Sequence, residues 1–199
     1  IFGRSPEGRC FAMRQGTSTV AEISPASYTS IAAEVYQWQD SLLMPFSIVD
    51  LSAMKIEHFP ISVPLGDPAL TLKYKFLSEE WSARQYEEDV TPELNKHRAN
   101  QFLKFMEELR VEQWLNPASP AAARALRFPS FRLTAIFQEL DEEGELKGFR
   151  ESSFELAAAT SSPRNRIFYG KVTGNPNYFV IGSEAYSSLR RSLLDTAEP

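Results

Sequence analysis

Cysteine and histidine are scarce in this chain, and their scarcity removes several kinds of chemistry. Among 199 residues there is one cysteine, Cys10, so the chain can form neither an internal disulfide nor a site built from several thiolates. The two histidines, His58 and His97, fall on different expected elements and in no nucleophile or metal-binding pattern. No glycine-rich loop precedes a helix. We therefore predict no catalytic residue, no metal site and no cofactor.

The chain also lacks an excess of basic residues and a long apolar run. Its 21 lysines and arginines are outnumbered by 26 aspartates and glutamates, which argues against a nucleic-acid partner. No apolar run is long enough to cross a bilayer. The first residue is Ile1 and not methionine, so we expect any membrane anchor to lie in a segment absent from this chain.

Hydrophobic residues make up 43% of the chain, which is enough for a packed core. Acidic clusters such as 141–145 lack the alternating spacing of a calcium loop and are explained by solvated turns and helix ends. The many aromatic residues fall mostly at strand or helix core positions. Packing therefore explains them better than a stacking platform for a flat ligand does.

Two stretches of the chain resemble each other. The segment 5–11 (SPEGRCF) is matched by 162–168 (SPRNRIF). After one inserted residue, four more pairs match: Gly16 and Gly174, Ile23 and Ile181, Tyr28 and Tyr186, and Ile31 and Leu189. A repeated pattern of this kind indicates a repeated supersecondary unit. We predict that residues 1–45 are the C-terminal part of a first unit and 46–199 a second unit, with an internal connection near 116–130.

The expected elements alternate between groups of strands and single helices. Leu70, Leu72, Tyr74 and Phe76 alternate with polar residues, which predicts a strand with one buried and one solvated face. Ser24, Thr91 and Ser183 resemble helix starts. The remaining expectations are a hairpin over 9–23, helices over 24–40, 91–110 and from 183, and strands over 51–59, 81–85, 111–115, 131–137, 154–159, 166–172 and 177–181.

Strands joined by tight turns pair antiparallel, so the fold class is α+β and not a doubly wound parallel sheet. The predicted architecture consists of tandem pseudo-symmetric units, each an antiparallel meander sheet packed by a helix. The polar residues of one strand, Thr71, Lys73 and Lys75, are exposed in this arrangement. We predict that they form an interaction surface.

A pattern of structural residues resembles a known bacterial family. It comprises the Ser-Pro-x-x-Arg-x-Phe segment, the step MPFS at 44–47, Trp81 at a hairpin end and VEQW at 111–114. In these features the chain resembles the family called domain of unknown function 4340. The resemblance implies repeats outside the cytoplasm behind an N-terminal membrane helix, often encoded beside ABC-type transport systems related to gliding motility. It carries no catalytic residues.

The leading hypothesis is a non-enzymatic, extracytoplasmic interaction module accessory to a membrane ABC-type transport assembly, with a transporter-like membrane protein as its partner. Stacked repeats offer extended surfaces to partner proteins. One alternative is a protein that binds an envelope polysaccharide or a peptidoglycan fragment, which would need an open groove lined by exposed aromatics. A second alternative is a hydrolase, which would need His58 or His97 near a serine and a carboxylate.

Overall fold

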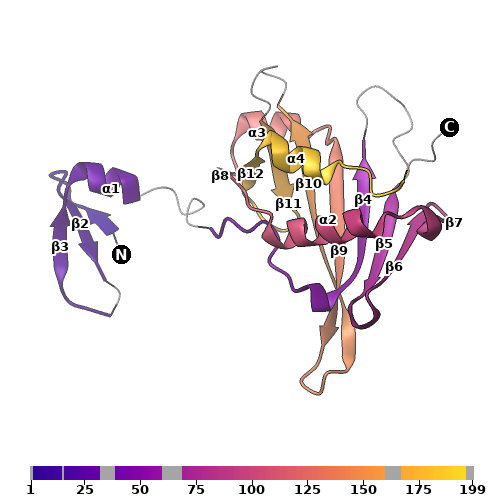
Figure 1. Ribbon diagram of the computed structural model, residues 1–199. Helices are drawn as coiled ribbons and strands as arrows, with labels where there is room; N and C mark the ends of the chain where they lie inside the picture. The colour runs from indigo at the N-terminus through magenta and orange to yellow at the C-terminus, as the bar shows by residue number, and fades with distance from the viewer. Residues whose placement is uncertain (1, 15, 32–38, 60–68, 160–166, 196–199) are drawn as a thin grey trace. The chain divides into compact units, whose positions relative to one another are not determined.

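The structure is a computed structural model that describes residues 2–14, 16–31, 39–59, 69–159 and 167–195 (Figure 1). It divides into two compact units, residues 1–39 and residues 40–199. All pairings between the named strands are antiparallel, and the helices are few. The α+β class and the antiparallel sheets are therefore confirmed.

The first unit is a three-stranded meander followed by a helix. The strands pair in the order β1-β2-β3. The elements are β1 (Phe2–Arg4), β2 (Cys10–Met13), β3 (Val20–Ile23) and α1 (Pro25–Ile31). Gly16 occupies the hairpin turn at φ +83°, a value that favours glycine. The Ser24 hydroxyl accepts a hydrogen bond from the backbone N–H of Ser27 at 3.0 Å, so the predicted helix cap is confirmed.

The second unit contains one sheet of nine strands in the order β7-β6-β5-β4-β9-β10-β11-β12-β8. The strands are β4 (Leu51–His58), β5 (Leu70–Lys75), β6 (Glu80–Gln85), β7 (Glu88–Asp89), β8 (Gln113–Leu115), β9 (Phe131–Leu140), β10 (Leu146–Ala158), β11 (Phe168–Val172) and β12 (Tyr178–Ile181). The predicted meander over residues 51–85 is confirmed, because β4 pairs with β5 and β5 with β6.

The strand groups of this unit do not form the separate sheets that we expected. The strands β4 and β9 pair along nearly their whole length, from His58 opposite Phe131 to Leu51 opposite Phe137. Each strand would otherwise be the edge of its own sheet, with a row of unpaired backbone groups. Pairing satisfies both edges at once and joins the groups into a single sheet.

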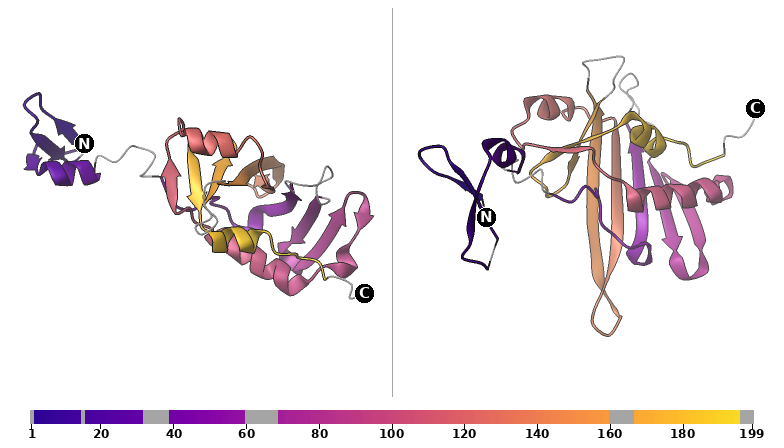
Figure 2. Two further views of the ribbon diagram at one scale, coloured as in Figure 1. Left: turned by 90° about the horizontal axis from the view of Figure 1, so that it is seen from above. Right: turned by 60° about the vertical axis from the view of Figure 1, so that its left-hand side comes forward.

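Two helices cover one face of this sheet. The helices of the unit are α2 (Lys96–Glu108), α3 (Pro120–Ala125) and α4 (Ser183–Leu189). Figures 1 and 2 show α2 and α4 on the same side of the sheet. The core lies between them and the inner strand face, whose fully buried side chains include Leu72, Phe131, Leu133, Phe154, Leu156, Phe179 and Ile181. The helix α2 contributes Ala99, Phe102, Leu103 and Met106.

The start of α2 differs from the prediction. Thr91 and Pro92 form a separate 3-10 turn, Thr91–Glu93, and the α-helix begins at Lys96. Leu94 between them has an extended backbone and forms an isolated bridge with Leu194. The Asn95 side chain accepts a hydrogen bond from the N–H of Arg98 at 3.0 Å and is the true cap.

The strand β10 is also longer than the predicted strand over 154–159. It begins at Leu146 and pairs with β9 up to Leu140, beyond the last residues that pair with β4 and β11. The predicted turn 141–145 joins the two strands, and the N–H of Asp141 donates to the Glu145 carbonyl at 2.9 Å. A two-stranded ribbon therefore projects from the end of the sheet (Figure 1).

Candidate functional site

The predicted interaction residues lie on the sheet face opposite α2. Thr71, Lys73 and Lys75 alternate along β5 with the buried residues of the core, and both lysines are exposed. The register continues this outer face across the sheet, because Thr71 lies opposite Lys55 and Lys73 opposite Ala53. Thr71, Lys73 and Lys75 therefore belong to an outer face of the sheet that continues from β5 onto β4.

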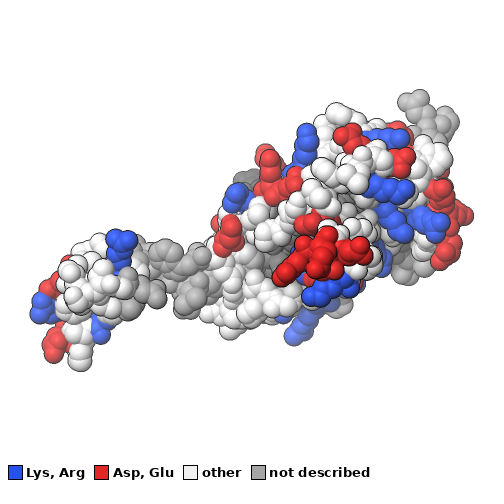
Figure 3. Space-filling model, turned by 90° about the horizontal axis from the view of Figure 1, so that it is seen from below, with Lys and Arg blue, Asp and Glu red and all other residues white. Residues whose placement is uncertain are grey.

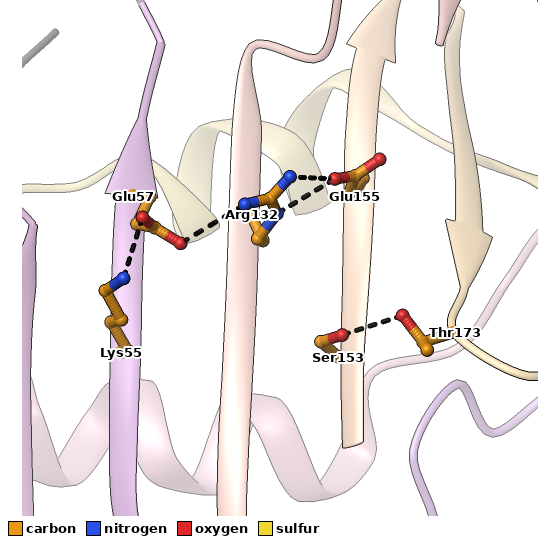
Figure 4. Close-up of polar contacts among 6 residues, drawn as sticks. All are labelled: Lys55, Glu57, Arg132, Ser153, Glu155 and Thr173. Atoms are coloured by element: carbon orange, nitrogen blue, oxygen red, sulfur yellow. Dashed lines mark hydrogen bonds and ion pairs between the residues drawn. The ribbon is translucent and has the colours of Figure 1, made fainter. Parts of the chain in front are cut away.

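Charged residues in the middle of the outer face neutralise one another (Figure 4). The Lys55 ammonium lies 2.9 Å from a Glu57 carboxylate oxygen. Arg132 bridges the next strands, with Nη1 3.8 Å from Glu57 and Nε donating to Glu155 at 2.8 Å. Beyond Glu155, the Lys171 ammonium lies 5.2 Å from the centre of a tyrosine ring.

The lysines of β5 are bound more loosely than these central cations. Lys75 forms only an exposed ion pair with Glu80 at 3.5 Å, a kind of contact that adds little stability. Lys73 forms no ion pair within the described part of the chain. Lys73 and Lys75 therefore leave positive charge available to a partner at the end of β5, and Arg84, opposite Thr71 in β6, adds an exposed cation to the same face.

A hollow of about 1010 Å³ lies beside Lys73 and Lys75, at the end of the sheet. It extends from the β5–β6 turn to β9, where Gln138 and Leu140 line it. Lys96, at the start of α2, adds a third cation, and the carboxylates of the hollow are Glu79 and Glu80. Figures 1 and 2 show that the β5–β6 turn and the β9–β10 ribbon both extend beyond the rest of the sheet here.

Apolar side chains are exposed around this hollow, and sequence reasoning missed them. Leu77 is 99% exposed and Phe76 is 44% exposed, and both line the hollow. Val49 is 56% exposed and Leu140 is 50% exposed. The alternation along 70–76 placed Phe76 in the core, and that prediction was wrong. A 3-10 turn over Phe76–Ser78 ends the strand register and turns this side chain outward.

The projecting ribbon carries more exposed apolar surface and an acidic tip. Leu140 pairs with Leu146 across the ribbon, and Phe149 follows opposite Gln138; the three apolar side chains are each half exposed or more. Seen from below, acidic side chains form a projecting group in the middle of the second unit (Figure 3). The turn at the tip of the ribbon contains Asp141, Glu142, Glu143 and Glu145.

The aromatic residues of the hollow are largely engaged in packing. Trp81 is 5% exposed, lies 4.6 Å from Tyr74 between ring centres, and donates its indole N–H to the Asn100 side chain at 2.7 Å. Burial, with a smaller effect from the charge of Glu79, raises the pKa of Tyr74 above its ordinary value. Phe76 is the exposed aromatic of this group.

The two histidines occupy different surroundings. His58 ends β4 with its ring centre 5.4 Å from that of Phe131, whereas His97 on α2 contacts Gln101 at 2.9 Å. Among the described residues, no group of three or more histidine, cysteine, aspartate or glutamate side chains is placed to hold a metal ion. Cys10 is buried in the first unit.

Comparison of the chain with protein-family models, with curated proteins and with solved structures finds no match. Within the described ranges, no helix combines the length and the apolar character needed to span a bilayer. The geometry of the hollow and of the outer sheet face therefore carries the functional argument.

Proposed function

We propose that this protein is a non-enzymatic interaction module that binds a partner protein at the end of its large sheet. The observation that carries the proposal is the group of exposed apolar side chains around the hollow, with Leu77 99% exposed. Exposed apolar side chains gathered at one place mark interaction sites more often than isolated ones do. Lys73 and Lys75 flank this group and favour an acidic surface on the partner.

A glycan-binding function needs exposed aromatic faces, and the hollow provides few of them. Trp81 is buried and Tyr74 packs against it, which leaves Phe76 as the exposed ring. The other exposed apolar side chains at the hollow are aliphatic: Val49, Leu77 and Leu140. Aliphatic surface suits a protein partner better than the face of a sugar ring.

The partner class and the location that we propose come from the family resemblance. We propose that the protein acts outside the cytoplasm as an accessory of a membrane ABC-type transport assembly. Its partner is then a transporter-like membrane protein, and the sheet end with Lys73 and Lys75 is the part that docks. The partner then needs an acidic, partly apolar surface to bind this end of the sheet.

We further propose that the first unit and the end of the second are two copies of one supersecondary unit. Both are three antiparallel strands followed by a helix: β1-β2-β3-α1 and β10-β11-β12-α4. In the hairpins Cys10 pairs with Ile23 and Phe168 pairs with Ile181, with equal spacing. This register makes Cys10 equivalent to Phe168. The matched sequence segments 5–11 and 162–168 instead make Phe11 equivalent to Phe168.

The function is tested with the full-length protein, tagged and expressed in its own organism. Lys73→Glu combined with Lys75→Glu should reduce co-purification of the membrane partner about tenfold or more, because two attractive contacts become repulsive. The melting temperature should stay unchanged, since both side chains are exposed.

A matched control places the same change of charge at the other end of the sheet. Arg124→Glu with Arg127→Glu alters two exposed arginines near α3, which lies away from the hollow (Figure 1). Co-purification should persist in this control. Equal losses in both variants would show that net charge, and not this surface, governs the association.

A further inference from the structure

A second hollow, of about 250 Å³, lies where the segment after α4 passes the ends of β4 and β5. It is distinct from the hollow beside Lys73 and Lys75, since the two have no described lining residue in common. Its apolar wall includes Ile56, Leu70 and Leu193, which are buried. Its polar groups are His58, Gln85, Arg190, Arg191 and Ser192.

The described charged residues that line this second hollow are of one sign. Arg190 and Arg191 both line it, and none of its described lining residues is an aspartate or glutamate. Neither arginine forms an ion pair with a described carboxylate. Nearby Arg98, by contrast, lies 3.5 Å from Asp195. Like charges gathered in a concave site raise the local potential and attract an anion.

Arg190 is exposed and contacts the core beneath it through Tyr186. Its guanidinium lies 5.8 Å from the centre of the Tyr186 ring, and its Nη1 donates to the Tyr186 hydroxyl at 3.5 Å. That hydroxyl is 2.7 Å from the buried Ser130 hydroxyl, and the ring stacks on Phe168 at 3.7 Å between centres. A guanidinium with these contacts loses less side-chain entropy when an anion binds than one without them.

Arg191 connects this hollow to a smaller one of about 160 Å³ between α2 and α4, and it lines both of them. Leu193 is also common to both, while Ser188 and Gln101 add polar groups to the smaller one. The side chain of Arg191 is exposed. Because it follows Arg190 directly in the chain and its side chain is exposed, Arg191 can turn toward an anion bound at Arg190.

We propose that the hollow at Arg190 and Arg191 binds the phosphate group of a small organic phosphate monoester. Two guanidinium groups and the Gln85 amide supply more donors than the two oxygens of a carboxylate can accept, while the Ser192 hydroxyl already donates to the Leu194 carbonyl at 3.0 Å. The three terminal oxygens and the double charge of a phosphate ester match them better. The apolar part of the ligand then contacts Ile56 and Leu70.

The test is calorimetric titration of the full chain at low ionic strength with phenyl phosphate, benzoate and phenol. Phenyl phosphate should bind, benzoate should bind at least tenfold more weakly, and phenol should not bind. Arg190→Gln and Arg191→Gln should each weaken phenyl phosphate about tenfold, which is the value of one charged hydrogen-bonding partner. Arg124→Gln, a change at an arginine outside the hollow, should leave binding unchanged.

Arg190→Gln also removes a contact with Tyr186, so Arg191→Gln is the variant that separates binding from folding. Absence of phenyl phosphate binding to the wild type would overturn the proposal. So would binding that is equally strong in Arg191→Gln, or benzoate binding as tight as that of phenyl phosphate, which would assign the site to carboxylates.

Discussion

Gly170 in β11 shows how closely the large core is packed at the level of one residue. It pairs with Phe179 in β12, and a Cβ on Gly170 would lie only 2.1 Å from the Phe179 ring. The ring is fully buried and has no free space into which to move. Gly170→Ala should therefore lower the free energy of unfolding by about 1–3 kcal/mol, measured by urea denaturation.

Gly148 in β10 is the matched control for this substitution. A Cβ there meets no atom within 4 Å, and the backbone angle is not one that favours glycine. Gly148→Ala should change the free energy of unfolding by less than about 0.5 kcal/mol. Similar losses in both variants would mean that strand backbone effects, and not contact with the Phe179 ring, determine the cost.

Tyr74, beside the hollow at the end of β5, should ionise at a higher pH in the folded protein than in the unfolded chain. Burial raises its pKa, and the charge of Glu79 raises it further. Because the folded pKa lies above the unfolded one, the stability that Tyr74 contributes is complete below a pH of about 10 and is lost as pH rises through the folded pKa. Ultraviolet titration of the wild type against Tyr74→Phe isolates this residue.

Two comparisons decide that prediction. Glu79→Gln should lower the pKa of Tyr74 only in part, since burial is the larger cause. The protein unfolded in urea serves as the reference for the same residue. If Tyr74 ionises at the same pH in the folded and the unfolded protein, burial does not raise its pKa and the prediction is wrong.

Single residues of the site were predicted where the strand register persists. The alternation along β5 correctly places Lys73 and Lys75 on the solvent side. It fails at Phe76, where the chain leaves the strand for a 3-10 turn. Leu77 could not be recognised from its residue type, because a leucine after a strand gives no sign of whether a neighbouring segment will cover it.

At the scale of elements, the start of α2 tests which side chain caps the helix. The Asn95 side chain accepts from Arg98 N–H and donates to Asp195 at 2.9 Å. Asn95→Ala should reduce the free energy of unfolding by about 1 kcal/mol, the usual value of a lost N-cap. Asn95→Ser keeps an oxygen acceptor and should restore most of that loss in the same denaturation experiment.

The position that the sequence suggested as the cap provides the contrast. Thr91 accepts a hydrogen bond from the N–H of Ala83 in β6, so its hydroxyl fixes a strand and not the helix. Thr91→Ser should therefore leave α2 intact and cost less than Asn95→Ala. A larger helix loss on changing Thr91 would restore the original prediction.

The existence of most elements could be predicted from the sequence, whereas their lengths and partners could not. Hairpins such as Phe168–Ile181 have turn residues and alternation that act locally. The pairing of β4 with β9 joins residues far apart in the chain, and no local pattern encodes it. The extension of β10 to Leu146 likewise depends on its pairing with β9.

At the scale of the molecule, the second unit presents a neutralised sheet centre and a charged, apolar end. Arg132 is paired with carboxylates on both sides, so the middle of the outer face has little free charge. Lys73, Leu77 and the β9–β10 ribbon lie at the end, where exposed charge and apolar surface occur together. This is the end at which we propose that a partner protein docks.

The most direct measurement of this claim is site-specific photo-crosslinking of the full-length protein in its own cells. A photoreactive side chain at Leu77 should crosslink to a membrane protein, and Lys73→Glu with Lys75→Glu should abolish the product. The same group at Phe128, which is 82% exposed but outside the hollow, should give no such product. Crosslinking from Phe128 but not from Leu77, or none from Leu77, would contradict the account.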